Sequence, residues 1–122
     1  MSGVLFLDDD PIRCARFVAA QPTAAIVTTA ADAIDALGRQ AWDLVSLDHD
    51  LGGEYYVDSA RDDTGMGVVR WVVAHKPVVG RFLVHSWNDA AGDAMVAALH
   101  AAGYPAARVY FGFNGFPEDG LS

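Results

Sequence analysis

Short apolar runs alternate with helical patterns along the chain, and this alternation limits the folds that the sequence can adopt more than any other feature. Runs of three or four apolar residues fit strands that are buried on both faces of a sheet. Helices between such strands imply a parallel sheet with right-handed crossovers. The sequence therefore predicts a single α/β domain over residues 1–122, with three layers. Five runs are predicted as strands: 4–7, 25–28, 44–47, 82–84 and 109–111.

Each predicted helix starts at a residue that can cap it. Asp10 precedes a proline at the first helical position, and Thr29, Thr64 and Asn88 precede the other three helical patterns. Gly103 is placed to end the fourth helix. Since Asp10 is accounted for as a cap, we do not predict it as a ligand.

The composition excludes several classes of function. The chain has a net charge of −8, and its first 63 residues hold twelve acids and four bases. Such a chain binds nucleic acid poorly without a specific site, so DNA is not an expected partner. No apolar run is long enough to span a membrane. One cysteine, and a start without the pattern of a signal peptide, lead us to expect a cytoplasmic protein.

Acidic residues follow two predicted strands directly, at the edge where open α/β sheets bind their ligands. Asp8 and Asp9 follow the first strand, and Asp48 follows the third. Crowded carboxylates repel one another unless a cation joins them, so these three are predicted metal ligands, with Asp50 as an additional ligand. Oxygen ligands favour magnesium or manganese, and zinc stays open if histidines take part.

Two histidines also follow buried strands. His49 and His85 are predicted to act as general base and general acid, and packing in the core is their alternative role. Asp48 is a further catalytic candidate, since either its carboxylate or a water molecule could act as the nucleophile. Ser86 and Asn88 lie at a predicted helix start, where they could bind phosphate or simply cap the helix.

The segment from Gly52 to Gly65 is longer than usual for a connection between strand and helix. It joins the strand of Asp48 to the third helix, so we predict a mobile lid over the site. Tyr55, Tyr56 and Arg61 would contact a base or a phosphate, and Arg61 is the predicted phosphate-binding cation. A surface loop without this role is the alternative.

The motifs VLFLDDDPIR and WDLVSLDHDLGG resemble response-regulator receiver domains, with Asp48 at the phosphoacceptor position. The resemblance implies a flavodoxin-like fold with five strands in the order 2-1-3-4-5. The chain departs from ordinary receivers in three ways. No lysine follows the fifth strand, and the final helix is expected to be short or missing. His85, with Ser86 beside it, displaces the small hydroxyl residue that receivers carry after the fourth strand.

LDHDLGG, Thr64-Gly65 and HSWN resemble the cyclic-phosphate-processing receiver-like family of bacteria and phages. This resemblance implies an activity on phosphoesters, such as the cyclic phosphate of an RNA end or a cyclic nucleotide. Together with the predicted metal ligands, it leads us to expect a metal-dependent phosphoesterase whose substrate is a phosphorylated small molecule, a cyclic nucleotide or an RNA end. The alternative is a non-catalytic, degenerate receiver that binds a protein or a nucleotide, and a homodimer is open. Aromatic residues would form the rim of such a binding surface: Tyr55, Tyr56, Trp87, Phe113 and Phe116.

Overall fold

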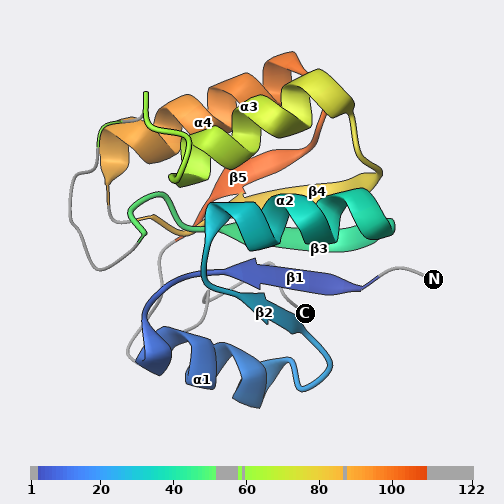
Figure 1. Cartoon of the computed structure of the whole chain (residues 1–122), viewed down its shortest axis with the longest axis vertical. Helices are drawn as coiled ribbons and strands as arrows, with labels where there is room; N and C mark the ends of the chain where they lie inside the picture. Colours follow the sequence, from blue (N-terminus) through green and yellow to red (C-terminus); the bar gives the residue numbers. More distant parts are fainter. Residues whose placement is uncertain (1–2, 52–57, 59, 87, 110–122) are drawn as a thin grey trace.

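The computed structural model describes residues 3–51, 58, 60–86 and 88–109. Its five strands are parallel and form one sheet in the order β2-β1-β3-β4-β5, which confirms the predicted architecture (Figure 1). β1 and β3 lie inside the sheet and carry the acidic strand ends. The strands are β1 (Val4–Leu7), β2 (Ala25–Val27), β3 (Trp42–Leu47), β4 (Val79–Val84) and β5 (Ala106–Arg108).

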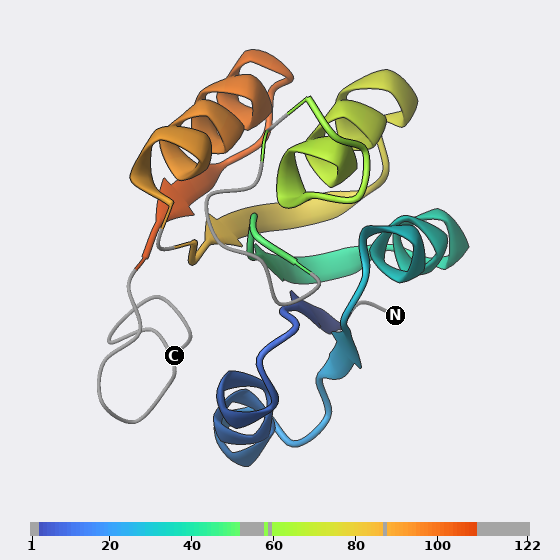
Figure 2. The same ribbon diagram turned by 60° about the vertical axis from the view of Figure 1, so that its left-hand side comes forward.

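Helices cover both faces of the sheet, as the three-layer prediction requires. α1 lies on one face, whereas α2, α3 and α4 lie together on the other, as Figures 1 and 2 show. The predicted short or missing final helix falls in residues 110–122, outside the described residues. No helix in the described part of the chain is long and apolar enough to cross a membrane. The helices are α1 (Pro11–Ala20), α2 (Ala30–Arg39), α3 (Gly65–His75) and α4 (Asp89–Ala101).

All four predicted N-caps are confirmed. Asp10, Thr29, Thr64 and Asn88 each accept a hydrogen bond from a backbone N–H in the first turn of their helix. Each side chain thereby satisfies one of the N–H groups that a helix start leaves without a partner. Gly103, at a φ of 96°, follows the end of α4 as predicted.

The core has a large and a small part. The larger part lies between the sheet and α2, α3 and α4, where Leu7, Leu47, Val72 and Met95 are among the fully buried side chains. The smaller part lies under α1, where Phe17 stacks on Phe6 with ring centroids 4.1 Å apart. Packing on both faces holds the ends of the central strands in fixed positions.

The fifth strand was predicted at the wrong place. β5 covers Ala106–Arg108, whereas the apolar run at 109–111 was predicted as the strand. Pairing starts where Pro105 accepts a hydrogen bond from the N–H of Phe82. β5 pairs only with β4, so this edge strand needs less apolar sequence than a central one. Val109 still donates to Val84, just beyond the strand, and residues 110–111 lie outside the described part.

Candidate functional site

The sheet register brings three distant segments to one edge. Leu7 pairs with Leu47, and Leu47 with Val84. The ladder continues one residue further, because the N–H of Asp48 donates to Leu7 and the N–H of His85 donates to Leu47. The residues that follow the three strands therefore lie side by side at the carboxyl edge of the sheet, as predicted.

Three carboxyl groups meet at this edge. One oxygen from each of Asp8, Asp9 and Asp48 lies within 4.8 Å of the others, and Asp8 and Asp48 are buried. Carboxylate oxygens at this spacing suit a hard divalent cation such as magnesium or manganese. The donor set therefore fits the predicted metal. We call these three residues the carboxylate cluster.

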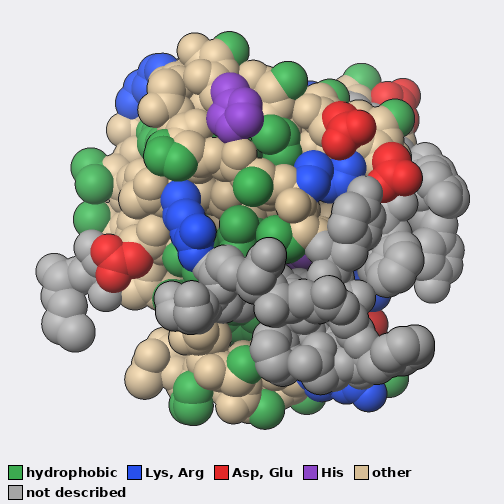
Figure 3. Space-filling view, turned by 180° about the vertical axis from the view of Figure 1, so that it is seen from behind, with side chains coloured by type: hydrophobic (Ala, Val, Ile, Leu, Met, Phe, Trp, Pro, Cys, Tyr) green, Lys and Arg blue, Asp and Glu red, His purple; other side chains and the backbone are tan. Residues whose placement is uncertain are grey.

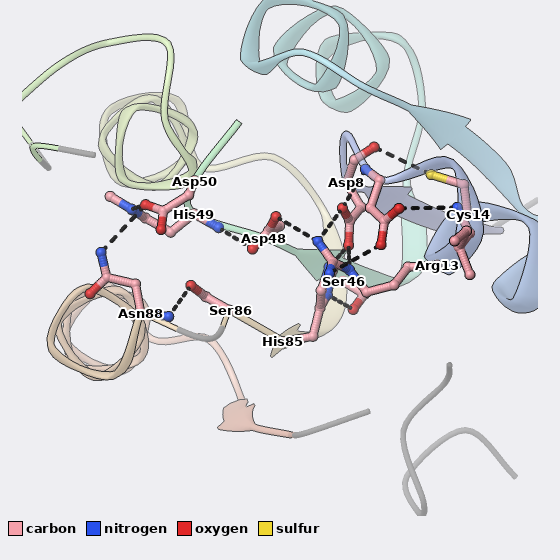
Figure 4. Close-up of polar contacts among 12 residues, drawn as sticks. Asp8, Arg13, Cys14, Ser46, Asp48, His49, Asp50, His85, Ser86 and Asn88 are labelled. Atoms are coloured by element: carbon pink, nitrogen blue, oxygen red, sulfur yellow. Dashed lines mark hydrogen bonds and ion pairs between the residues drawn. The ribbon is translucent and has the colours of Figure 1, made fainter. Parts of the chain in front are cut away.

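Arg13 also belongs to the site, although the sequence analysis did not identify it. From the first turn of α1 its Nε and Nη2 donate to the two oxygens of Asp8 at 2.7 and 2.9 Å. Figure 4 shows the guanidinium lying among the carboxyl groups. Burial alone would lower the pKa of Arg13, but its bonds to Asp8 and the nearby acids raise it above the ordinary value. Arg13 is thus a permanent cation in contact with the cluster.

His85 holds Asp8 from the other side. Its Nε2 lies 3.1 Å from Oδ2 of Asp8, and its Nδ1 lies 2.7 Å from Oγ of Ser46. An ionised carboxylate can only accept, so Nε2 carries the proton and donates to Asp8. The neutral ring then accepts at Nδ1 from the Ser46 hydroxyl. Ser46 and His85 are fully buried, and the His85 ring stacks on Phe6 with centroids 4.7 Å apart.

The buried acids have opposite pKa shifts. Burial alone would raise the pKa of Asp8, but hydrogen bonds from His85 and Arg13 outweigh it and lower this pKa from 3.8 to about 2. Burial, and next the charge of Asp8, raise the pKa of Asp48 from 3.8 to about 8. Burial also lowers the pKa of His85 below 6.5, against the effect of Asp8. Near neutral pH the metal-free site therefore holds an ionised Asp8, a largely protonated Asp48 and a neutral His85.

A second group of polar side chains lies beside the cluster. Nδ1 of His49 donates to Oδ1 of Asp50 at 2.8 Å, and the amide of Asn88 donates to the same oxygen at 3.4 Å. In Figure 4 Asp48 lies between this group and the side of the site that holds Asp8. Asp50 thus orients a fully buried histidine and lies outside the carboxylate cluster.

Ser86, Asn88 and Arg108, the last residue of β5, make the polar contacts at the start of α4. Oγ of Ser86 accepts from the N–H of Asn88 at 3.0 Å, and Oδ1 of Asn88 caps the helix at Ala91. Arg108 donates to the carbonyl of Ser86 at 2.7 Å and pairs with Asp89 at 3.0 Å. Capping is therefore confirmed for Asn88, and Arg108 is a second basic residue that the sequence analysis missed.

The start of α3 packs directly against the backbone of Asp48. The N–H of Gly65 donates to the carbonyl of His49 at 3.0 Å. A Cβ atom on Gly65 would lie 2.1 Å from the carbonyl oxygen of Asp48, so only glycine fits there. The Thr64 hydroxyl accepts from the N–H of Gly67 and donates to the carbonyl of Arg61. The Thr64-Gly65 pair thus holds α3 next to the cluster.

Replacing Gly65 with alanine should destabilise the protein by about 3 kcal/mol, because the new methyl group would overlap the backbone of Asp48, which cannot move aside as a flexible side chain can. Thermal unfolding of both forms would measure this. Gly38→Ala is the matched control, since its Cβ would lie 3.9 Å from Trp71, which is ordinary contact. That change should stabilise α2 by up to about 1 kcal/mol. Equal effects at the two positions would contradict the close approach at Gly65.

The segment before α3 is described only in part. Arg61 pairs with Asp63 through Nε and Nη2, at 3.0 and 2.6 Å, and its carbonyl accepts from Arg70. These contacts belong to the approach to α3, and phosphate binding by Arg61 stays a prediction. Residues 52–57 and 59 lie outside the described part, and with them the lid and its tyrosines. The same holds for the rest of the predicted aromatic rim: Trp87, Phe113 and Phe116.

Comparison with known families identifies the group to which these features belong. The family profile described as Cyclic-phosphate processing Receiver domain matches residues 4–101, which is most of the chain. The chain belongs to this family. The matched range includes the motifs LDHDLGG and HSWN, which provide Asp48, His49, Asp50, His85 and Ser86. The resemblance stated from the sequence is thus confirmed for this receiver domain, whereas no curated protein matches it significantly.

Solved structures support the fold of this receiver domain. The signal receiver domain of a putative Luxo repressor protein from Vibrio parahaemolyticus has a TM-score of 0.62 at 18% identity, over 93% of this chain and 81% of that one. A response regulator from Burkholderia pseudomallei, with a phosphorylated aspartic acid, calcium ion and citrate, has a TM-score of 0.62 at 13% identity, over 94% and 62%. The RcsB response regulator of Salmonella typhimurium has a TM-score of 0.56 at 16% identity, over 89% and 52%.

Proposed function

We propose that this receiver domain is a divalent-metal-dependent phosphoesterase that opens cyclic phosphates, as its family description suggests. The observation that carries the proposal is the carboxylate cluster, because three carboxyl oxygens within 4.8 Å of one another at the carboxyl edge of a parallel sheet match the ligands of a hard divalent cation. Magnesium or manganese suits this all-oxygen set better than zinc. A similar fold with a calcium ion and a phosphorylated aspartic acid supports this by analogy alone.

In this proposal Asp8, Asp9 and Asp48 hold the cation, which when bound would polarise a phosphoryl oxygen of the ester. Water attacks phosphorus, one ring P–O bond breaks, and the leaving oxygen takes a proton. We assign the attack to water and not to Asp48, because no lysine follows β5 to retain a phosphoaspartate. Ser86, Asn88 and the N–H groups at the start of α4 would bind the other phosphoryl oxygens.

The two histidines receive different roles. His49 is our candidate for proton transfer, because it follows Asp48 directly and the carboxylate of Asp50, 2.8 Å from its Nδ1, orients its ring. His85 was predicted as the general acid. Its bonds to Asp8 and Ser46, which engage both ring nitrogens, favour a positioning role that keeps Asp8 directed at the cluster. Asp50 then supports His49 and is not itself a ligand.

The charge of the chain favours a small substrate. A net charge of −8 repels the backbone of a long nucleic acid. Figure 3 shows one side of the molecule, where Lys and Arg side chains are dispersed and form no continuous basic stripe. A cyclic nucleotide or the cyclic phosphate at an RNA end is therefore the substrate class that we propose.

The proposal predicts that the purified chain opens 2′,3′-cyclic or 3′,5′-cyclic AMP when Mg²⁺ or Mn²⁺ is present, and does not do so in EDTA. ³¹P NMR would follow the products. Asp9→Asn should lower the rate by about 100-fold or more, because it removes a metal ligand. Asp43→Asn is the matched control, since Asp43 is an exposed acid near the start of β3, away from the carboxyl edge of the sheet. It should change the rate by less than about threefold.

The non-catalytic alternative has its own support, since both nitrogens of His85 are engaged inside the protein. Calorimetry with Mg²⁺ separates the two. If the cation binds and no cyclic phosphate is opened, the chain is a metal-binding regulatory module and the phosphoesterase proposal fails. If the cation does not bind at all, the metal site itself fails.

A further inference from the structure

Arg13 lies within ion-pair distance of three carboxyl groups, those of Asp8, Asp10 and Asp48. Its Nε and Nη2 lie 2.7 and 2.9 Å from the oxygens of Asp8, and Nη1 lies 3.2 Å from Asp10. Nη2 is also 3.6 Å from Oδ2 of Asp48. A planar guanidinium that bonds both oxygens of one carboxylate makes a strong, directional ion pair. Arg13 therefore supplies the positive charge that the cluster needs in the metal-free protein.

These bonds use the acceptor capacity of Asp8. Oδ1 accepts from the N–H of Asp10 at 2.9 Å and from Arg13, and Oδ2 accepts from Arg13 and from His85 at 3.1 Å. A carboxylate offers about four lone-pair sites. Four hydrogen bonds fill them, so a metal ion could not bond to Asp8 while all four remain.

We propose that Arg13 is a built-in competitor for the metal site, and that a divalent cation binds by displacing its guanidinium from Asp8. This inference rests on the metal site of the proposed function. Among the partners of Asp8 only Arg13 can yield without unfolding. The N–H of Asp10 belongs to the backbone, and the His85 ring is fully buried, whereas the Arg13 side chain is 26% exposed on a flexible stem.

The exchange lowers the apparent affinity for the cation, because breaking the Arg13–Asp8 pair opposes binding. A charge-assisted hydrogen bond in a buried site contributes enough that losing the pair should change the dissociation constant by about tenfold or more. Arg13 then sets a threshold, so that the cluster fills only at high metal concentration. Without Arg13 the same acids should bind the cation more tightly.

Calorimetric titration with Mg²⁺ of the full chain and three variants tests this. Arg13→Ala should bind about tenfold more tightly than the unmodified protein, and Arg13→Lys should lie between them, because lysine keeps the charge and loses the fork. Arg16→Ala is the matched control, an exposed arginine one turn further along α1. It changes the net charge equally and should tighten binding less than threefold.

The outcomes separate this inference from the proposed function. If Arg13→Ala binds no more tightly than Arg16→Ala, the competition is wrong, although the metal site stands. If no form binds Mg²⁺, the site and the competition both fail. If Arg13→Ala does not fold, the Mg²⁺ affinity of Arg13→Lys tests the proposal instead. An Arg13→Lys protein that binds Mg²⁺ no more tightly than the unmodified protein would overturn it. In the unmodified protein, the NMR signal of the Arg13 Nε–H should lose its protection from solvent exchange as Mg²⁺ is added.

Discussion

Replacing Asp48 with asparagine should raise the melting temperature of the metal-free protein by about 10 °C. The Asp48 carboxyl is buried next to ionised Asp8, and these two causes raise its pKa to about 8. Asparagine removes that repulsion, and its Oδ1 can still accept from the N–H of His49 as Asp48 does at 2.9 Å. We expect the free energy of unfolding to rise by something on the order of 3 kcal/mol near pH 8. For a domain of about this size, such a gain corresponds to the expected rise of about 10 °C in melting temperature.

The effect has a defined pH dependence. The pKa of Asp48 is raised in the folded state, so the folded state holds its proton where the unfolded chain has already lost it. Stability of the unmodified protein in EDTA should therefore fall as the pH rises from about 4 to about 8. Asp8 has the opposite sign, because its pKa is lowered to about 2. Its contribution is present above about pH 4 and is lost as the pH falls toward 2.

Thermal unfolding at several pH values, in EDTA and in saturating Mg²⁺, measures both effects. Asp43→Asn is the control, because it replaces an exposed acid on the same strand and should change the melting temperature much less than Asp48→Asn does. Added Mg²⁺ should stabilise the unmodified protein and not Asp48→Asn, since only the former keeps all three carboxylates. A lower melting temperature for Asp48→Asn in EDTA would show that repulsion between Asp48 and Asp8 does not destabilise the folded protein.

The sequence was sufficient for the features that depend on local patterns. Apolar runs that stop at Asp8, Asp48 and His85 predicted both the strands and the edge at which they end, because parallel strands align their carboxyl ends. The N-caps could also be predicted from the sequence, since Asp10 followed by Pro11 is a typical pattern for the start of a helix. The strand β5 is short and only weakly apolar, so the pattern of apolar runs did not predict it. Its Ala106 and Ala107 carry no strand preference, and pairing with β4 alone decides their structure.

The parts of the site that the sequence analysis did not predict depend on contacts between residues that are distant in sequence. Arg13 looks like an ordinary polar position of a helix, and only the packing of α1 beside β1 brings its guanidinium to Asp8. Ser46 is a single hydroxyl inside an apolar strand, and its bond to His85 crosses 39 positions of sequence. A cation four or five residues after an acidic strand end is a signal that could have indicated Arg13. The role of His85 could not be read without knowing that both its nitrogens are engaged.

Changes at His85 should have the largest effect on the site, and two variants distinguish positioning from catalysis. His85→Leu removes the donor to Asp8 and the acceptor for Ser46, so it should destabilise the protein by about 2–4 kcal/mol and weaken Mg²⁺ binding. His85→Gln keeps an N–H that can donate to Asp8, but it cannot transfer a proton near neutral pH. A positioning role predicts that His85→Gln keeps most of the Mg²⁺ affinity and of the phosphoesterase rate.

Catalysis by His85 predicts a different pattern, in which His85→Gln binds Mg²⁺ normally and loses at least about 100-fold in rate. The rate would also lose one limb of its pH profile. Ser46→Ala gives an independent readout, because Ser46 lies inside β3, before the carboxyl edge of the sheet, and its hydroxyl bonds to His85. If it lowers Mg²⁺ affinity while the protein stays folded, the effect must pass through His85 to Asp8. A Ser46→Ala protein with unchanged Mg²⁺ affinity would argue against the chain of bonds as a support for the metal site.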